Sequence, residues 1–221
     1  MECKLLNSDD YLTLFHEIKN SISLIGSSLQ LIEKKHPEVH TFDYWAETMG
    51  EVTSLRNMVT QLSSAHLYTN PQFQQINLSV YMEEISHAIA ALSDKNFYCE
   101  ITFEDPLPPV EFDPQLIKQA LLNLIKNSYE AMGQTGTIQF VLSLREAFLQ
   151  IKLIDHGGGL DPALADAIFE PFITSKTGGS GLGLVITKQI IESHHGTITC
   201  TSRTGDGCTF TIMLPVFQQH S

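Results

Sequence analysis

Apolar side chains recur through the N-terminal part of the chain at alternating spacings of four and three residues. A first series comprises Tyr11, Phe15, Ile18, Ile22, Ile25, Leu29 and Ile32, and a second comprises Trp45, Thr48, Val52, Leu55, Val59 and Leu62. This heptad spacing predicts two amphipathic helices. Between them, Pro37 disfavours helix at His36, so the first helix is expected to end there. We therefore expect an antiparallel helical hairpin over residues 1–70.

The two predicted helices carry more apolar surface than a single hairpin can cover. Additional apolar residues broaden both series: Leu24, Leu31, Phe42, Met49 and Met58. Two copies that pair as a four-helix bundle would bury this surface. The sequence therefore predicts a homodimer.

The helical periodicity stops near Thr69, and the turn residues Asn70 and Pro71 mark the predicted domain boundary. Residues 71–221 predict an α+β fold, in which helices cover one face of a mixed sheet. The predicted strands cover residues 98–103, 137–144, 149–154, 197–201 and 209–214. The predicted helices cover residues 80–92, residues 114–132 with Asp113 as N-cap, and a segment that ends near His195 with Gly196 as its C-terminal cap.

Composition and charge narrow the classes of partner and the location. A formal net charge of −12 argues against nucleic acid, because binding to a phosphate backbone normally needs a basic face. No stretch approaches the roughly 20 apolar residues of a membrane-spanning helix, and the N-terminus lacks a secretory pattern, so the expected location is the cytoplasm. No zinc-site spacing connects the scattered cysteines, which are Cys3, Cys99, Cys200 and Cys208. The pair His194 and His195 is interpreted as a cationic helix C-terminus.

Two polar blocks in the predicted α+β domain carry candidate chemistry. Asn123 and Asn127 lie four residues apart, which places both carboxamides on one face of the predicted helix. Because asparagine is a poor helix former, the pair suggests side chains that serve a ligand, although asparagines on a helix surface are also common. Asp155 ends a predicted strand and is followed by glycines at 157–159. Such an aspartate can accept a hydrogen bond from an exocyclic amine such as that of adenine, or it can cap a plain turn.

A glycine-rich block opens the last predicted helix. Gly179, Gly181 and Gly183 stand at its start, where free N–H groups and the positive end of the helix dipole favour phosphate. Thr174 and Lys176 precede this block on a predicted flap, which suits a lid over a triphosphate. The spacing matches neither the G-x-G-x-x-G dinucleotide fingerprint nor the G-x-x-x-x-G-K-[ST] phosphate loop, so both of those classes are excluded.

The order of these blocks resembles the N, G1, F and G2 boxes of the histidine-kinase ATP-binding domain, whose fold is shared with the Hsp90, gyrase and MutL ATPases. The resemblance covers about residues 75–217. Its residues are Asn123 and Asn127, then Asp155, Gly157 and Gly159, then Phe169 and Phe172, then Gly179, Gly181 and Gly183, and last the segment 207–210.

This resemblance implies a Mg-ATP site. Asn127 would help to hold Mg²⁺ and Asn123 would approach the phosphates. Asp155 would bind the adenine amine, with Thr209 as a neighbour of the adenine pocket, and Lys176 would contact the phosphates from the lid. The remaining implied contacts to the nucleotide come from Gly157, Gly159, Thr174, Gly179, Gly181, Leu182 and Gly183.

The hairpin contains the sequence His16-Glu17-Ile-Lys-Asn20, which resembles the H box of the same family, especially in its nitrogen-regulation sensor kinases. His16 lies one residue off the apolar series, on a predicted solvent-accessible flank. With an unperturbed pKa of about 6.5, histidine offers a neutral nucleophilic nitrogen at cytoplasmic pH. The resemblance implies that Glu17 fixes the ring tautomer and that Asn20 orients water for dephosphorylation of a response regulator. Ser21 stands where the family usually has proline, which removes a helix kink.

The sequence therefore predicts a two-component histidine kinase that binds Mg-ATP, phosphorylates itself on His16 and passes the phosphoryl group to an aspartate of a response regulator. Its signal would come from a separate sensor protein or from a sensor domain outside this chain.

Three alternatives share part of the pattern. An adaptor with a decayed ATP site conflicts with the intact asparagine, aspartate and glycine boxes. A serine kinase of the anti-sigma type would lack the hairpin. An Hsp90-type ATP hydrolase would carry an acidic base on the N-box helix, where Asn123 stands.

Overall fold

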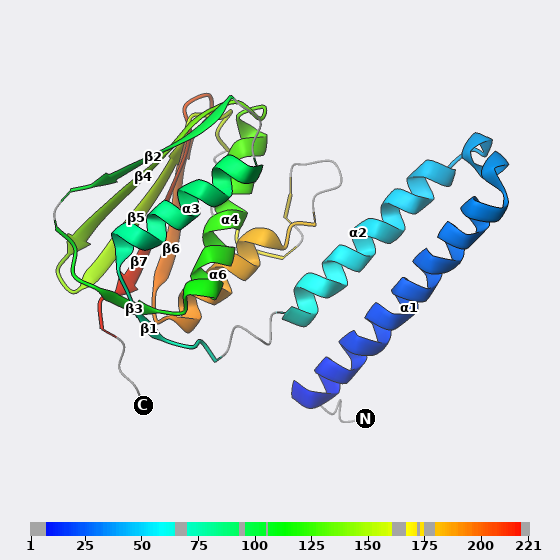
Figure 1. Cartoon of the computed structure of the whole chain (residues 1–221), viewed down its shortest axis with the longest axis horizontal. Coiled ribbons are helices and arrows are strands. Elements are labelled where there is room, and N and C mark those ends of the chain that lie inside the picture. The colour runs from blue at the N-terminus through cyan, green and yellow to red at the C-terminus, as the bar shows by residue number, and fades with distance from the viewer. Residues whose placement is uncertain are drawn as a thin grey trace.

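The N-terminal part of the chain forms the expected hairpin. The computed structural model describes residues 8–64, 70–92, 96–104, 106–160, 167–171, 173–174 and 180–217. Helix α1 (Ser8–Lys35), the 3-10 turn η1 (Pro37–Thr41) and helix α2 (Trp45–Ser64) follow one another, and Figure 1 shows α1 and α2 antiparallel. The N–H of His36 makes the last bond of α1, to the carbonyl of Ile32 at 2.7 Å, and η1 begins at Pro37. The prediction of a hairpin with a break at this proline is confirmed.

A stripe of isoleucines on α1 is left uncovered by α2. Ile18, Ile25 and Ile32 recur every seven residues and are 36 %, 52 % and 42 % exposed. In contrast, Ile22 of α1 and Val59 of α2 are buried. One hairpin therefore buries only part of its heptad series, as the sequence predicted.

The C-terminal part contains a five-stranded sheet with the strand order β2-β4-β5-β7-β6. In that order, the strands span Phe97–Phe103, Gly136–Arg145, Phe148–Asp155, Gly207–Pro215 and Thr197–Arg203. β2 and β4 are parallel, whereas the other neighbouring strands are antiparallel. The sheet is therefore mixed, as predicted, and each strand contains the range predicted for it.

A second, two-stranded antiparallel sheet was not predicted. It pairs β1 (Gln74–Ile76) with β3 (Val110–Phe112). Each strand has three residues, which is too short to show the alternation by which a strand is recognised in a sequence.

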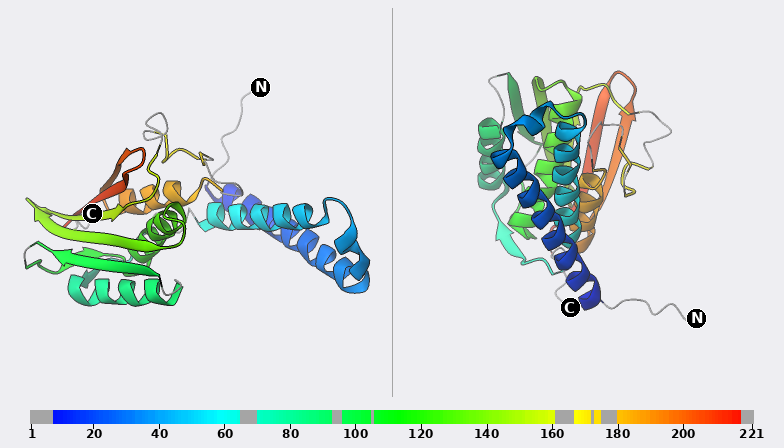
Figure 2. Two further views of the ribbon diagram at one scale, coloured as in Figure 1. Left: turned by 90° about the horizontal axis from the view of Figure 1, so that it is seen from above. Right: turned by 90° about the vertical axis from the view of Figure 1, so that its right-hand side faces the viewer.

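Helices α3 (Leu78–Leu92), α4 (Pro114–Ala131) and α6 (Gly183–Ser193) cover one face of the five-stranded sheet (Figures 1 and 2). α3 begins two residues before its predicted start because Asn77 Oδ1 accepts from the N–H of Ser79 at 3.1 Å. α4 begins as predicted, with Asp113 Oδ1 accepting from the N–H groups of its first turn. No helix in the described part of the chain combines the length and apolar character needed to cross a membrane.

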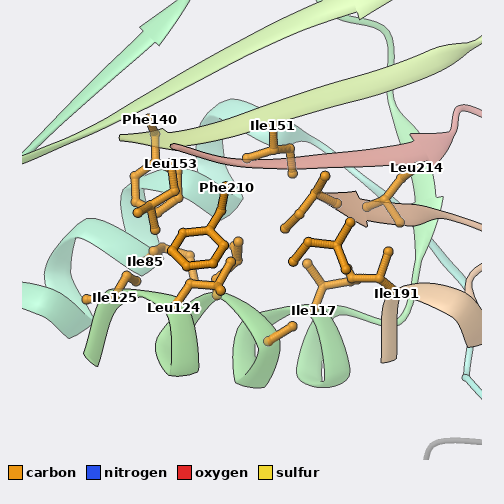
Figure 3. Packing of buried hydrophobic residues seen from close by; sticks show 14 of the residues in the cluster. Ile85, Ile117, Leu124, Ile125, Phe140, Ile151, Leu153, Ile191, Phe210 and Leu214 are labelled. Carbon is orange, nitrogen blue, oxygen red and sulfur yellow. The ribbon is translucent and has the colours of Figure 1, made fainter. Parts of the chain in front are cut away.

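The core lies between these helices and the sheet (Figure 3). Ile117 and Leu124 of α4 point from one side toward Ile151 of β5 and Phe210 of β7 on the other. All four are almost completely buried, and buried and half-buried residues alternate from Leu149 to Asp155 and from Cys208 to Pro215. The alternation predicted for these strands is therefore present, with the buried residues on the face that the helices cover.

The end of α6 differs from the prediction in one detail. The residue in the left-handed conformation is His195, with φ +57°, and not Gly196. The N–H of His195 donates to Glu192 O and that of Gly196 to Ile191 O, both at 2.9 Å, which is the Schellman pattern. Gly196 is required for another reason, since a Cβ there would lie 2.5 Å from the carbonyl oxygen of Met213 on β7.

Candidate functional site

Asp155, the last residue of β5, is the buried centre of the site, with an exposed fraction of 2 %. Its Oδ1 accepts from the backbone N–H of Gly157 at 3.0 Å and of Cys208 at 3.2 Å. Its Oδ2 accepts from the hydroxyl of Ser128 at 2.8 Å. A buried carboxylate is costly unless it is hydrogen-bonded, and these three donors meet that need. They come from α4, from the loop after β5 and from β7, so the carboxylate joins three parts of the fold.

Glycines around Asp155 lie close to neighbouring backbone. A Cβ at Gly157 would lie 2.9 Å from the carbonyl oxygen of Ala131 on α4. Gly159 and Gly207 have φ of +70° and +90°, and a Cβ there would collide with the backbone of Arg203 and of Asp155, respectively. The predicted glycine block after Asp155 therefore has a structural reason at 157 and 159.

Both asparagines of α4 lie on one face of the helix and are half-buried, as the spacing predicted. Asn123 Nδ2 donates to the carbonyl of Gly183 at 3.3 Å, so it joins α4 to the first residue of α6. Asn127 follows one turn later, directly before Ser128. The N-box helix, the Asp155 carboxylate and the start of α6 are therefore brought together.

Leu182 precedes α6 and makes no side-chain hydrogen bond to its first turn. Gly181 has φ +64°, whereas a Cβ at Gly183 would meet no described heavy atom within 4 Å. A helix start without a side-chain cap leaves N–H groups that a phosphate can accept from.

The predicted lid is only partly described. Lys176 and Gly179 lie outside the described residues, as does Phe172 of the F box. Thr174 is exposed, and Phe169 packs against the core.

Thr209 is not brought to Asp155. In the register of β5 and β7, Asp155 faces Cys208, and Thr209 faces Ile154. Because successive side chains of a strand point to opposite faces, Thr209 lies on the face away from Asp155. The sequence prediction had passed over Cys208, whose thiol donates to Ser202 Oγ at 3.3 Å. A hydrogen bond with the thiol of Cys200 lowers the pKa of Cys208 to about 7, against the effect of burial, which raises it.

Ser128 was also missed in the sequence. Its only signal there is a polar residue at a position of the helix that continues the apolar series of Leu121 and Leu124. The structure shows it buried, with an exposed fraction of 1 %.

In the hairpin, His16 lies within α1, and its side chain is outside the described part of the structure. Glu17 and Asn20 follow on the same helix and are exposed. The predicted helix around His16 is therefore present.

Comparisons with known proteins identify the family. Residues 112–218 match the family described as histidine kinase-, DNA gyrase B-, and HSP90-like ATPase. The catalytic domain of the histidine kinase ThkA has 30 % sequence identity and a TM-score of 0.59, over 66 % of this chain and 96 % of that domain. The chain belongs to the histidine kinase family. This confirms both the resemblance and the predicted fold class.

Longer relatives extend the likeness into the hairpin. The sensor histidine kinase ZraS of Escherichia coli (strain K12) is 34 % identical over 206 residues, which are 91 % of this chain and 44 % of ZraS. The histidine kinase/phosphatase NtrB of Salmonella typhimurium is 29 % identical over 219 residues, which are 92 % of this chain and 60 % of NtrB. ThkA in complex with the response regulator TrrA has 25 % identity and a TM-score of 0.67, over 95 % of this chain and 62 % of that chain. The chain thus spans about half of the length of the curated relatives that it matches.

Proposed function

We propose that the chain is a two-component histidine kinase that binds Mg-ATP, phosphorylates itself on His16 and transfers the phosphoryl group to an aspartate of a response regulator. The observation that carries this proposal is the triple hydrogen bonding of the buried Asp155 carboxylate beside the asparagines of α4 and the start of α6. Residues 1–70 would be the phosphoacceptor and dimerisation domain, and residues 71–221 the ATP-binding domain.

The nucleotide would bind between α4, the loop after β5 and the start of α6. Asp155 Oδ2, which accepts only one of the three bonds to the carboxylate, would accept from the adenine amine. The N–H groups at the start of α6 would face the phosphates, with Thr174, Lys176 and Gly179 closing over them.

The residues present fit a Mg²⁺ ion that is held mainly by the nucleotide. Among the described residues there is no cluster of three or more histidine, cysteine or acidic side chains that could enclose a metal. Mg²⁺ commonly keeps water and phosphate oxygens and takes few protein ligands, so the carboxamide oxygen of Asn127 would suffice. Bound there, the ion would neutralise charge that develops on the transferred group.

In the transfer, an unprotonated ring nitrogen of His16 would attack the γ-phosphorus, forming an N–P bond as the bond to the bridging oxygen breaks and ADP leaves. Glu17 would accept a hydrogen bond from the N–H of the other ring nitrogen and so hold the reactive tautomer. The protein contributes mainly position and charge stabilisation to such a step. Asn20, exposed one turn after His16, would orient water for a phosphatase activity toward the response regulator.

The proposed partners follow from the hairpin. The uncovered stripe of Ile18, Ile25 and Ile32 supports a homodimer. The response regulator bound to the related kinase ThkA supports a partner of that class.

The test is incubation with γ-labelled ATP and Mg²⁺, followed by exposure of the product to acid and alkali. We expect an acid-labile, alkali-stable label in the unchanged chain and none in His16→Gln or Asp155→Asn. His40→Gln, which changes an exposed histidine of the same hairpin, is the matched control and should be labelled normally. A label that survives acid would overturn the His16 mechanism, and ATP binding without a label would favour the adaptor.

A further inference from the structure

The hydrogen-bonding role of Ser128 is fixed by its neighbour. Ser128 Oγ lies 2.8 Å from Asp155 Oδ2, and an ionised carboxylate can only accept. Ser128 must therefore donate its single hydroxyl hydrogen to Asp155. A serine in a helix often donates instead to the carbonyl one turn earlier, and here the bond to Asp155 replaces that bond.

One oxygen of Asp155 and the hydroxyl oxygen of Ser128 remain available to a ligand, and both can only accept hydrogen bonds. Asp155 Oδ1 is occupied by the N–H groups of Gly157 and Cys208, which leaves Oδ2 and Ser128 Oγ. Ser128 and Asp155 are 1 % and 2 % exposed, so an incoming group would meet them with little water in between. In such surroundings an unpaired polar atom is costly, and the match of donors to acceptors decides what binds.

We propose that Ser128 is a specificity-determining residue that, with Asp155, forms a pair of acceptors for the two hydrogens of a purine 6-amino group. This inference rests on the proposed function, because it requires adenine to bind at Asp155. A 6-amino group supplies two donors to the pair. A 6-oxo group supplies only lone pairs, and a purine with hydrogen at position 6 supplies no strong donor, so both leave the two oxygens without a donor from the ligand.

The test compares three nucleotides by calorimetric titration of the full chain: ATP, purine riboside 5′-triphosphate and inosine 5′-triphosphate. The unchanged chain should prefer ATP to each of the others by more than tenfold. Ser128→Ala should reduce that preference about fivefold, the effect of about one hydrogen bond, mainly through weaker ATP binding. Ser128→Cys, which keeps the shape of the side chain with a much weaker acceptor, should act in the same direction and serves if the alanine variant is unstable.

Ser143 provides a matched control. It is also 1 % exposed, and its hydroxyl donates to Gln150 Oε1 at 3.4 Å on the neighbouring strand. Ser143→Ala removes a buried serine hydroxyl away from Asp155 and should leave the preference for ATP unchanged.

The outcomes separate this inference from the proposed function. If Ser128→Ala weakens all three nucleotides equally, or changes none of them, Ser128 does not select the base and the inference fails. If the unchanged chain binds purine riboside triphosphate as tightly as ATP, adenine recognition at Asp155 fails as well. A preference for ATP that Asp155→Asn abolishes and Ser128→Ala reduces supports both.

Discussion

The backbone N–H of Asp113 donates a hydrogen bond to Nε2 of His194 over 3.0 Å, and thereby joins the start of α4 to the end of α6. A backbone N–H can only donate, so Nε2 is unprotonated, and Nδ1 carries the proton that bonds Ile190 O at 2.7 Å. His194 is completely buried, with the ring of Phe73 edge-on at 5.4 Å between centroids. The interpretation of His194 as part of a cationic helix end is therefore wrong, whereas its neighbour His195 is exposed.

Burial lowers the pKa of His194, with His195 acting in the same direction and the carbonyl of Ile190 and the charge of Asp113 acting against it. A histidine whose pKa is lowered by folding contributes stability that is complete above its unfolded pKa of about 6.5 and is lost as the pH falls toward the folded pKa. We expect the free energy of unfolding, measured in urea, to decrease between pH 7.5 and 5.5. In His194→Gln that decrease should be smaller, and the value at pH 7.5 about 1–3 kcal/mol lower.

His87, an exposed histidine of α3, gives the control for this prediction. His87→Gln should retain both the stability and the pH dependence of the unchanged chain. If His194→Gln shows the same pH dependence as well, another group is responsible.

Gly207 and Gly205 have similar backbone angles and different surroundings. Their φ values are +90° and +86°, yet a Cβ collides with the Asp155 carbonyl at the first and meets no described heavy atom within 4 Å at the second. Gly205→Ala should cost only backbone strain, about 1 kcal/mol. Gly207→Ala should cost more than about 2 kcal/mol in thermal unfolding and weaken ATP binding, because the Cys208 N–H would move from Asp155. Equal losses in the two variants would show that the collision does not matter.

No described residue would contact a Cβ at Gly183, so packing does not require glycine there. We expect Gly183→Ala to leave the melting temperature nearly unchanged, because alanine favours a helix and its methyl group has space. ATP binding should nevertheless weaken several-fold, and adenosine binding should not, since the methyl group would crowd the N–H groups proposed to face the phosphates. Gly181→Ala, at φ +64°, should lower the melting temperature instead. Unchanged ATP affinity in Gly183→Ala would contradict a phosphate site there.

The heptad stripe of α1 predicts the effect of one charge on assembly. Light scattering after size exclusion should show a dimer for the unchanged chain. Ile25→Asp should raise the dimer dissociation constant at least about a hundredfold. The side chain of Ile25 is 52 % exposed in the single hairpin, and the proposed dimer would bury a charge in its place. Ser23→Asp adds the same charge at an exposed position on the other flank of α1 and should remain dimeric. A dimer in both variants would place the interface elsewhere.

The sequence by itself determined the hairpin, the strands of the mixed sheet and the Asp113 cap, because heptad spacing, alternation and capping act between residues only a few positions apart. It also placed Asn123, Asn127 and Asp155 on their elements, through spacing and the order of the motifs. What surrounds Asp155 was decided by tertiary structure. Its donors Ser128 and Cys208 lie 27 and 53 residues away along the chain.

The same distinction explains two differences between the sequence interpretation and the structure. Thr209 is one residue past Cys208, which pairs with Asp155. Only the pairing of β7 with β5 decides that Cys208 and not Thr209 shares a face with Asp155. His194 is polar and near a helix end in the sequence, yet it is buried because the helix start at Asp113 packs against it. Hydrogen bonds between distant segments form only once the sheet and helices have assembled, so no local pattern records them.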